Sequence, residues 1–120
     1  MIYHVGYEVS DLARSARFYD AVFYALGARR IVSSERAVAY GLDAPTVWIV
    51  ARDRPPAPGY GHIALRASGK AAVDAAYRAG IGNGGSDDGE PGPRPQYGDR
   101  YYAAYMRDPD GLRVEVVSSR

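Results

Sequence analysis

Three side chains in this sequence are of the types that bind divalent metals, and each stands in a context that favours this role. His4 and His62 are the only histidines, and each begins a short run of β-forming residues. Glu115 interrupts the apolar run 114–117, where a buried carboxylate is stable only if it is paired or bound to a metal. Two imidazoles and one carboxylate leave open positions on Fe(II), Mn(II), Co(II), Ni(II) or Zn(II), through which a substrate chelates by two oxygens.

Each of these side chains also has a plainer interpretation. A single histidine near the start of a strand is most often a surface residue or a hydrogen-bonded core residue. Glu115 would face solvent if its strand lay at the edge of a sheet. Two histidines at equivalent places in an internal repeat favour the metal site over these alternatives.

The repeat consists of a strand, a helix and three further strands, written twice along the chain. Three matches support it, at the opening strand, at a turn that follows a tyrosine, and at the closing strand. They pair Tyr3-His4-Val5 with Gly61-His62-Ile63, Tyr40 and Asp43 with Tyr105 and Asp108, and the run 47–50 with the run 114–117. If the two units pack about a two-fold axis, His4 and His62 come to matching places on the two halves.

The elements that must position these residues follow from hydrophobic spacing and turn signals. In the first unit we expect strands over 2–9, 28–33, 36–40 and 46–51, and a helix over 12–26 with Ser10 or Asp11 as its N-cap. A Pro-rich connector covers 52–59. In the second unit we expect strands over 60–67, 101–106 and 113–118, and a helix over 71–79 with Ser68 as its cap. The Pro-containing segment 86–99 is predicted to be a loop with at most one short extended segment.

Composition excludes several classes of protein. The length of 120 residues predicts one domain, and a formal net charge of +1 gives no electrostatic footprint for nucleic acid. The absence of cysteine excludes a disulfide framework, an iron–sulfur cluster and a thiolate zinc site. No apolar stretch is long enough for a membrane helix, and Met1 leads directly into a strand-like segment without a signal-peptide pattern. We therefore expect a cytoplasmic protein with neither nucleic-acid nor membrane partners.

Short motifs spread over nearly the whole chain carry a resemblance to a known family. They are His4-Val5-Gly6, Ser10-Asp11-Leu12, Ser15, Phe18-Tyr19, Leu26-Gly27, Gly61-His62-Ile63-Ala64, the segment 105–111 and Val114-Glu115-Val116. The chain resembles the vicinal-oxygen-chelate superfamily, which includes glyoxalase I, fosfomycin-resistance enzymes, extradiol dioxygenases and bleomycin-resistance proteins. The resemblance implies an α+β fold in which two βαβββ modules, 1–51 and 60–120, are joined by the linker 52–59 in a single domain. The modules would form an open cup-shaped mixed β-sheet, with His4, His62 and Glu115 as metal ligands inside it.

One ligand position departs from part of this family. Trp48 stands where glyoxalase I-like members have a fourth ligand, a glutamate, and a tryptophan cannot ligate a metal. The other three positions are similar to the facial triad of extradiol dioxygenases. Trp48 is then either a flat, substrate-binding wall beside the metal or an ordinary core residue.

Strand alternation suggests two more side chains on the metal face. Glu8 shares a face with His4, and Arg66 shares a face with His62. We expect Glu8 and Arg66 to pair across the two-fold axis, either as a general base and an anion anchor or as a structural ion pair. Glu8 and Glu115 are therefore the candidate catalytic residues, and Arg66 is a candidate substrate ligand.

The loop before the seventh strand is expected to cover the cup. Arg94, Gln96 and Tyr97 are placed to touch substrate there, or the loop makes no contact with it at all. In the seventh strand either Tyr101 together with Tyr105, or Tyr102, lines the site. We take Tyr102 as the substrate-binding residue and add Arg94 and Tyr97 from the loop.

The function that we predict is that of a metal-dependent enzyme acting on a small oxygen-rich substrate, either a lyase or isomerase of glyoxalase type or an extradiol dioxygenase-like enzyme. Its cofactor is a divalent metal ion. The alternative is a metal-free protein of bleomycin-resistance type that sequesters a flat or cationic compound, favoured mildly by the 11 tyrosines and Trp48. A regulatory role is a third option. Members of this size usually form homodimers, and in some of them the metal site draws ligands from both chains.

Overall fold

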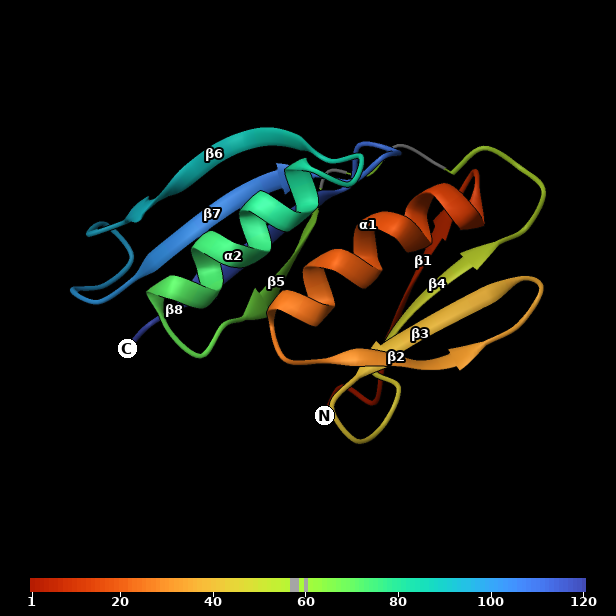
Figure 1. Cartoon of the computed structure of the whole chain (residues 1–120), viewed down its shortest axis with the longest axis horizontal. Coiled ribbons are helices and arrows are strands. Elements are labelled where there is room, and N and C mark those ends of the chain that lie inside the picture. Colours follow the sequence, from red (N-terminus) through yellow and green to blue (C-terminus); the bar gives the residue numbers. More distant parts are fainter. Residues whose placement is uncertain (57–58, 60) are drawn as a thin grey trace.

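The computed structural model describes residues 1–56, 59 and 61–120, and eight strands and two helices are assigned within them (Figure 1). The first unit comprises β1 (Val5–Val9), α1 (Leu12–Ala25), β2 (Arg29–Ser33), β3 (Ala37–Gly41) and β4 (Val47–Ala51). The second comprises β5 (His62–Arg66), α2 (Lys70–Ile81), β6 (Ser86–Pro93), β7 (Tyr102–Arg107) and β8 (Arg113–Ser118). Within the described residues, neither helix is long and apolar enough to cross a membrane.

The strands form two four-stranded sheets with the same internal arrangement. Their orders are β1-β4-β3-β2 and β5-β8-β7-β6. In each sheet the opening strand lies at one edge and pairs in parallel with the closing strand, while the remaining pairs are antiparallel. This arrangement confirms the predicted α+β class and the βαβββ repeat.

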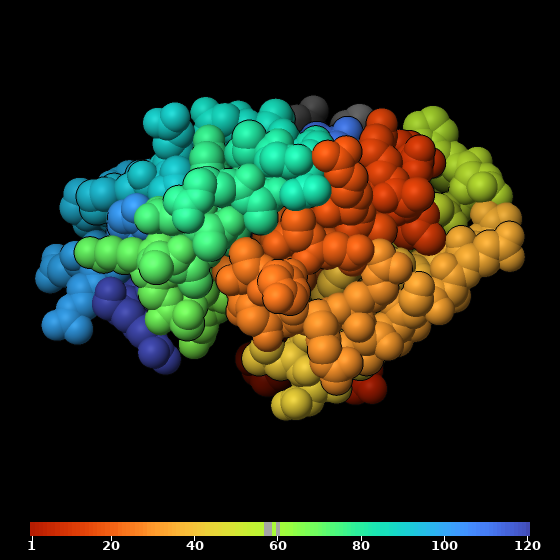
Figure 2. All heavy atoms as spheres, in the orientation of Figure 1, coloured from red at the N-terminus to blue at the C-terminus, as the bar shows by residue number. Residues whose placement is uncertain are grey.

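Each helix covers one face of its own sheet, and the two helices pack against each other (Figure 1). Asp11 is the N-cap of α1, since its side chain accepts a hydrogen bond from the backbone N–H of Arg14 at 3.0 Å. Gly27 follows the helix with φ of 82°, a conformation that glycine adopts without steric cost. Figure 2 shows α1 and α2 in contact on one side of the molecule. We call the helix-covered face of each sheet its inner face and the opposite one its outer face.

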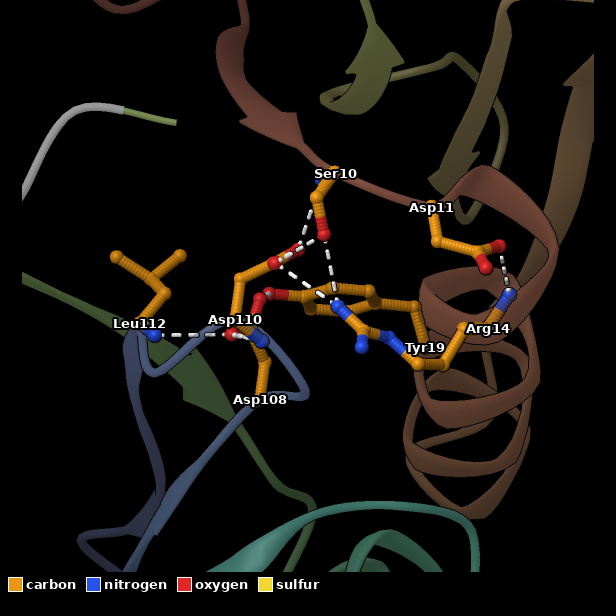
Figure 3. A network of polar contacts seen from close by, with 7 residues as sticks. All are labelled: Ser10, Asp11, Arg14, Tyr19, Asp108, Asp110 and Leu112. Atoms are coloured by element: carbon orange, nitrogen blue, oxygen red, sulfur yellow. Dashed lines mark hydrogen bonds and ion pairs between the residues drawn. The ribbon is translucent and has the colours of Figure 1, made fainter. Parts of the chain in front are cut away.

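A polar network joins the two units where β1 leads into α1 (Figure 3). Asp110 Oδ1 accepts hydrogen bonds from Ser10 Oγ at 2.5 Å and from Arg14 Nη2 at 2.9 Å. Asp108 Oδ2 accepts from the Tyr19 hydroxyl at 2.7 Å, while its Oδ1 accepts from two backbone N–H groups of the turn. Burial raises the pKa of the Asp108 carboxyl. These contacts hold the end of β1 against the turn between β7 and β8.

β6 shows that the predicted loop over 86–99 is wrong in its first half. Ser86–Pro93 pairs with β7 although it contains two prolines. An edge strand tolerates proline because one side of it has no partner for backbone N–H groups. The register shifts between Asp87 and Gly89 and again between Gly89 and Gly92, so the strand pairs only intermittently.

The start of the second unit also differs in detail from the expectation. The N-cap of α2 is Gly69 and not Ser68, and it makes no side-chain hydrogen bond. Tyr60, which was expected to open the fifth strand, lies outside the described residues, and β5 begins at His62.

The strand register corrects one of the three repeat matches. Tyr105 lies opposite Glu115, whereas the residue opposite Trp48 in the first sheet is Ala39. The structural equivalent of Tyr105 is therefore Ala39, and Tyr40 lies one position further along β3. Because alternate residues point to opposite faces, this shift places Tyr40 in the inner core and Tyr105 on the outer face. The cause is an extra residue in the connection between β7 and β8. Residues 41–46 lie between the paired residues Tyr40 and Val47, whereas the longer segment 107–113 lies between the paired residues Met106 and Val114.

Candidate metal centre

The outer face of the second sheet carries a compact set of polar and aromatic side chains. On β8, Val114 and Val116 point into the inner core, so Glu115 between them points outward. The register sets Glu115 beside Tyr105 of β7. In the neighbouring row, His62 of β5 lies beside Arg113 of β8, which also pairs with Arg107 of β7.

Glu115 is a buried carboxylate with two close partners. Its residue exposure is 2%, although it lies on the outer face. Its Oε1 is 3.2 Å from Nε2 of His62, and its Oε2 accepts a hydrogen bond from the Tyr101 hydroxyl at 2.5 Å. The hydrogen bond to the carboxylate raises the pKa of Tyr101 to about 12, so the phenol keeps its proton and acts as the donor. Among the described residues, no Lys or Arg forms an ion pair with Glu115.

The pair of His62 and Glu115 fits two ligands of one metal ion. Ligand atoms bound at about 2.0–2.2 Å and at right angles to each other lie about 3 Å apart. The separation of 3.2 Å between the imidazole nitrogen and the carboxylate oxygen matches this spacing. The side chain of His62 is 44% exposed, so the pair can be reached from solvent. An imidazole and a carboxylate are also the donor types that transition metals take.

His4 lies apart from this pair, on the outer side of the first sheet. Its ring is 6.2 Å from that of Trp48, centroid to centroid. β1 runs upward in Figure 1 from the N-terminus, whereas β5 runs downward. The start of β1 therefore lies at the lower side of the molecule in this view, and the start of β5 at the upper side. No three His, Asp or Glu side chains in the described part of the chain come together as a metal site. One chain therefore unites His62 with Glu115, and His4 with Trp48, but does not unite the two pairs.

Glu8 has different partners from the one that was predicted. Its carboxylate accepts hydrogen bonds from Nε and Nη2 of Arg54 at 2.8 and 2.7 Å, and Arg52 is 3.8 Å away. The expected pair with Arg66 is not formed. The reason is local, because β4 pairs with β1 and the residues that follow β4 pass over the end of β1. The hydrogen bond from Arg54 lowers the pKa of Glu8. Arg66 lies on the outer face of the second sheet, four residues along β5 from His62.

Tyr102 does not lie on the face that carries Glu115. Its hydroxyl donates to Asp74 of α2 at 2.7 Å, and the ammonium of Lys70 lies 5.7 Å from its ring centroid. The structure has the other parity, with Tyr101 and Tyr105 on the outer face. The side chain of Tyr102 therefore points away from the position that the substrate prediction required.

The loop between β6 and β7 lies on the outer face. The guanidinium of Arg94 is 5.7 Å from the ring centroid of Tyr105, and Tyr97 packs edge-on against Tyr101 at 5.4 Å. Arg94 and Tyr97 are thus brought close to Glu115 through these two tyrosines. A cleft of about 940 Å³ opens where β1 and the start of β5 come together. It is lined by Gly6, Glu8, Arg54 and His62, together with the turn after β7.

The sequence prediction leaves out two residues near the site, Tyr101, which bonds to Glu115, and Asp88, which bonds to Arg113. Tyr101 appeared only as one of two parity options, because alternation in a strand does not say which residue starts the count. Asp88, which binds Nε of both Arg113 and Arg107, sits in the segment that was expected to be a loop. An alternating pattern is weak there because Gly and Pro replace the apolar residues that would reveal it.

The paired βαβββ repeat defines the class of fold, and comparison with known proteins places the chain within it. A family model described as Glyoxalase/Bleomycin resistance protein/Dioxygenase superfamily matches residues 1–116. The chain belongs to this superfamily, which confirms the resemblance seen in the sequence. A search of curated proteins finds no match.

Solved structures of the same superfamily are similar over nearly the whole chain. A glyoxalase/bleomycin resistance protein from Albidiferax ferrireducens is 35% identical with a TM-score of 0.84, over 95% of this chain and 94% of that one. Fosfomycin resistance protein FosX from Mesorhizobium loti is 23% identical with a TM-score of 0.71, over 98% and 91% of the two chains. FosX from Listeria monocytogenes, in a complex with Mn(II) and 1S,2S-dihydroxypropylphosphonic acid, is 22% identical with a TM-score of 0.70, over 97% and 87%.

Proposed function

We propose that this protein is a metal-dependent enzyme acting on a small, oxygen-rich substrate that chelates a divalent metal, with glyoxalase- or dioxygenase-like chemistry. The observation that carries the proposal is the buried carboxylate of Glu115, which contacts His62 and forms no ion pair with a Lys or Arg among the described residues. A carboxylate removed from water is stable when it is paired or coordinates a metal, and a metal held by Glu115 and His62 would supply this positive charge. The relationship to FosX, which has been solved with Mn(II), supports a metal in this role.

We place the third ligand, His4, on a second copy of the chain. His4 and Trp48 share the outer face of the first sheet, while His62 and Glu115 share that of the second. In a two-fold dimer, the outer face of the first sheet of each chain would pack against the outer face of the second sheet of the other chain. This contact would occur twice and complete two equivalent metal sites. The N-terminal segment supports this contact, because Met1, Ile2 and Tyr3 are apolar and are 121%, 79% and 87% exposed in the single chain.

The bound metal would polarise the chelated oxygens of the substrate. The protein supplies the rest. Tyr101 holds the carboxylate of Glu115 in one orientation through its hydrogen bond. Trp48 offers a flat wall next to His4. Glu8 stays the candidate for proton transfer since it lines the same cleft as His62, and Arg54 keeps it ionised while lowering its basicity.

Metal analysis of protein purified without chelator tests the proposal. We expect wild-type protein to contain a stoichiometric transition metal and the His62→Ala and Glu115→Gln variants to lose it. Glu35→Gln is the matched control, because Glu35 is an exposed carboxylate in the turn between β2 and β3. Wild-type protein that is free of metal and fully stable would overturn the proposal and favour the sequestering protein instead.

Mixed dimers test whether the site is shared. Chains carrying His4→Ala and chains carrying His62→Ala are given different affinity tags, co-expressed, and purified as heterodimers. If the site is shared, each variant alone binds no metal, and the heterodimer regains one of its two sites, about half the metal of the wild-type dimer. If all ligands came from one chain, the heterodimer would stay empty.

A further inference from the structure

Arg113 lies on the same outer face as the proposed metal ligands and has no role in the function proposed above. Arg113 is the direct cross-strand neighbour of His62 in the register of β5 and β8. It precedes Glu115 by two residues on the same face of β8, which is about 7 Å along a strand. Its side chain leans from β8 across β7, since its guanidinium contacts Tyr105 of β7 and Asp88 of β6. A substrate held at His62 and Glu115 therefore reaches this guanidinium if it extends over the ring of Tyr105.

Two contacts fix the orientation of Arg113. Its Nε donates to Asp88 Oδ2 at 2.8 Å, and its guanidinium carbon lies 4.1 Å from the ring centroid of Tyr105. The contact with the aromatic ring and the hydrogen bond to the carboxylate together restrict the orientation of the group. Among the described residues, the hydrogen bonds of the Arg113 side chain are confined to Nε. The edge formed by its two Nη atoms is left for a ligand.

The charges on this outer face are strongly unequal. Arg66, Arg94, Arg107 and Arg113 contribute four positive charges, and Asp88 and Glu115 contribute two negative ones. A divalent ion at His62 and Glu115 would add two more positive charges. Such a surface repels a cationic compound and attracts an anion.

We infer that the substrate carries an oxyanion, a carboxylate or a phosphonate, next to its chelating oxygens, and that Arg113 binds this group through its two Nη atoms. The planar fork of a guanidinium matches both kinds of oxyanion with two parallel hydrogen bonds. The inference rests on the proposed function, since it takes the metal at His62 and Glu115 as the other half of the binding site.

Three hydroxamates with the same chelating group test this inference. Acetohydroxamate has no further charge, malonomonohydroxamate adds a carboxylate, and phosphonoacetohydroxamate adds a phosphonate. Their dissociation constants are measured by calorimetry on Mn(II)-loaded wild-type protein and on Arg113→Met and Arg113→Lys variants. Arg78→Met is the control, because it removes the same charge from an exposed position on α2, on the other side of the sheet.

We expect at least one anionic hydroxamate to bind wild-type protein about tenfold more tightly than acetohydroxamate, and the stronger of the two identifies the oxyanion. Arg113→Met should remove this preference and leave acetohydroxamate binding within about twofold, and Arg113→Lys should restore part of it because the charge stays but the fork is lost. Arg78→Met should change nothing.

The outcomes separate this inference from the proposed function. Binding of Mn(II) and acetohydroxamate with no anion preference would overturn the inference alone. A preference that survives Arg113→Met would show that another group binds the anion and would also overturn it. Protein that takes up no metal would overturn the proposed function, and the inference with it.

Discussion

The two sheets have the same strand order, yet their outer faces carry different chemistry. In the first sheet Trp48 lies between Gly6 and Ala39, and in the second sheet Glu115 takes the matching place beside Tyr105. Backbone pairing is the same in both, and it sets no requirement on the side chains that point outward. The duplicated scaffold therefore supplies an aromatic wall on one side and a carboxylate ligand on the other.

The inner cores of the two units differ as well. The first is built on aromatic rings, with Phe23 stacked on Tyr40 at 4.6 Å and Tyr19 edge-on to Phe18 at 4.9 Å. The second is built on smaller side chains, among them Val73, Ala76, Ala104, Met106 and Val114. The first unit thus depends on a few large residues, and the second on many small contacts. The predictions below test these contrasts.

The largest effect is expected at Tyr40, which alignment of the repeats had equated with Tyr105. Tyr40→Ala removes a fully buried ring, its stack on Phe23 and its hydrogen bond to Asp20, and should cost about 3–5 kcal/mol of unfolding free energy in urea titrations. Tyr105→Ala also removes a buried ring, which is 8% exposed on the outer face, but without the aromatic stack and the buried hydrogen bond of Tyr40 it should cost less, about 2–3 kcal/mol. A loss at Tyr105 as large as that at Tyr40 would contradict the central place of Tyr40 in the inner core.

The two turn aspartates should also differ in their effect on stability. Asp108→Ala leaves the Tyr19 hydroxyl and two backbone N–H groups without an acceptor, at a cost of about 2–4 kcal/mol. Asp43, which the repeat in the sequence matches with Asp108, is exposed, and Asp43→Ala should change stability by less than about 0.5 kcal/mol. Thermal and urea unfolding of both variants measure this. A small effect at Asp108 would show that the junction in Figure 3 is not what holds the units together.

A moderate effect on metal affinity is expected from Tyr101. Its hydroxyl bonds to Glu115, whereas Trp48, at the matching place in the first sheet, has no such partner among the described residues. Tyr101→Phe removes the hydrogen bond to Glu115 and should weaken binding of Mn(II) about tenfold, with little change in the melting temperature. Tyr97→Phe keeps the edge-on ring contact and should bind metal like wild type. Competition titration with a chromophoric chelator gives both affinities. Unchanged affinity in Tyr101→Phe would remove this residue from the site.

The smallest effect is the pH dependence that comes from Asp108. Burial raises its pKa in the folded protein above the ordinary value of 3.8, so the folded form binds the proton more tightly than the unfolded chain. Its contribution to the free energy of unfolding therefore grows as the pH falls through the raised pKa and is complete below the unfolded value. Relative to Asp108→Asn, wild-type protein should gain stability between pH 7 and pH 4, and a constant difference would contradict the raised pKa.

Much of this molecule follows from local patterns in the sequence. The spacing of apolar residues and the Asp11 cap locate α1 within one residue at its C-terminal end, and alternation locates β8. The closing-strand position of Glu115 and the opening-strand position of His62 put two ligand types on adjacent strands. β6 escaped prediction because its Gly and Pro residues remove the alternating apolar pattern, and its pairing depends on β7 instead.

The sequence by itself determined the repeat, the α+β class and the types of residue available for a metal. Tertiary structure alone decided which of them meet. The packing of α1 against α2 and the bonds between Ser10 and Asp110 set β1 and β5 in opposite directions, which separates His4 from His62 within one chain. Turn length decided that Tyr105 and not Tyr102 faces Glu115, and the path after β4 gave Glu8 to Arg54 instead of Arg66. Contacts between distant segments govern these choices, and no periodicity within a single strand encodes them.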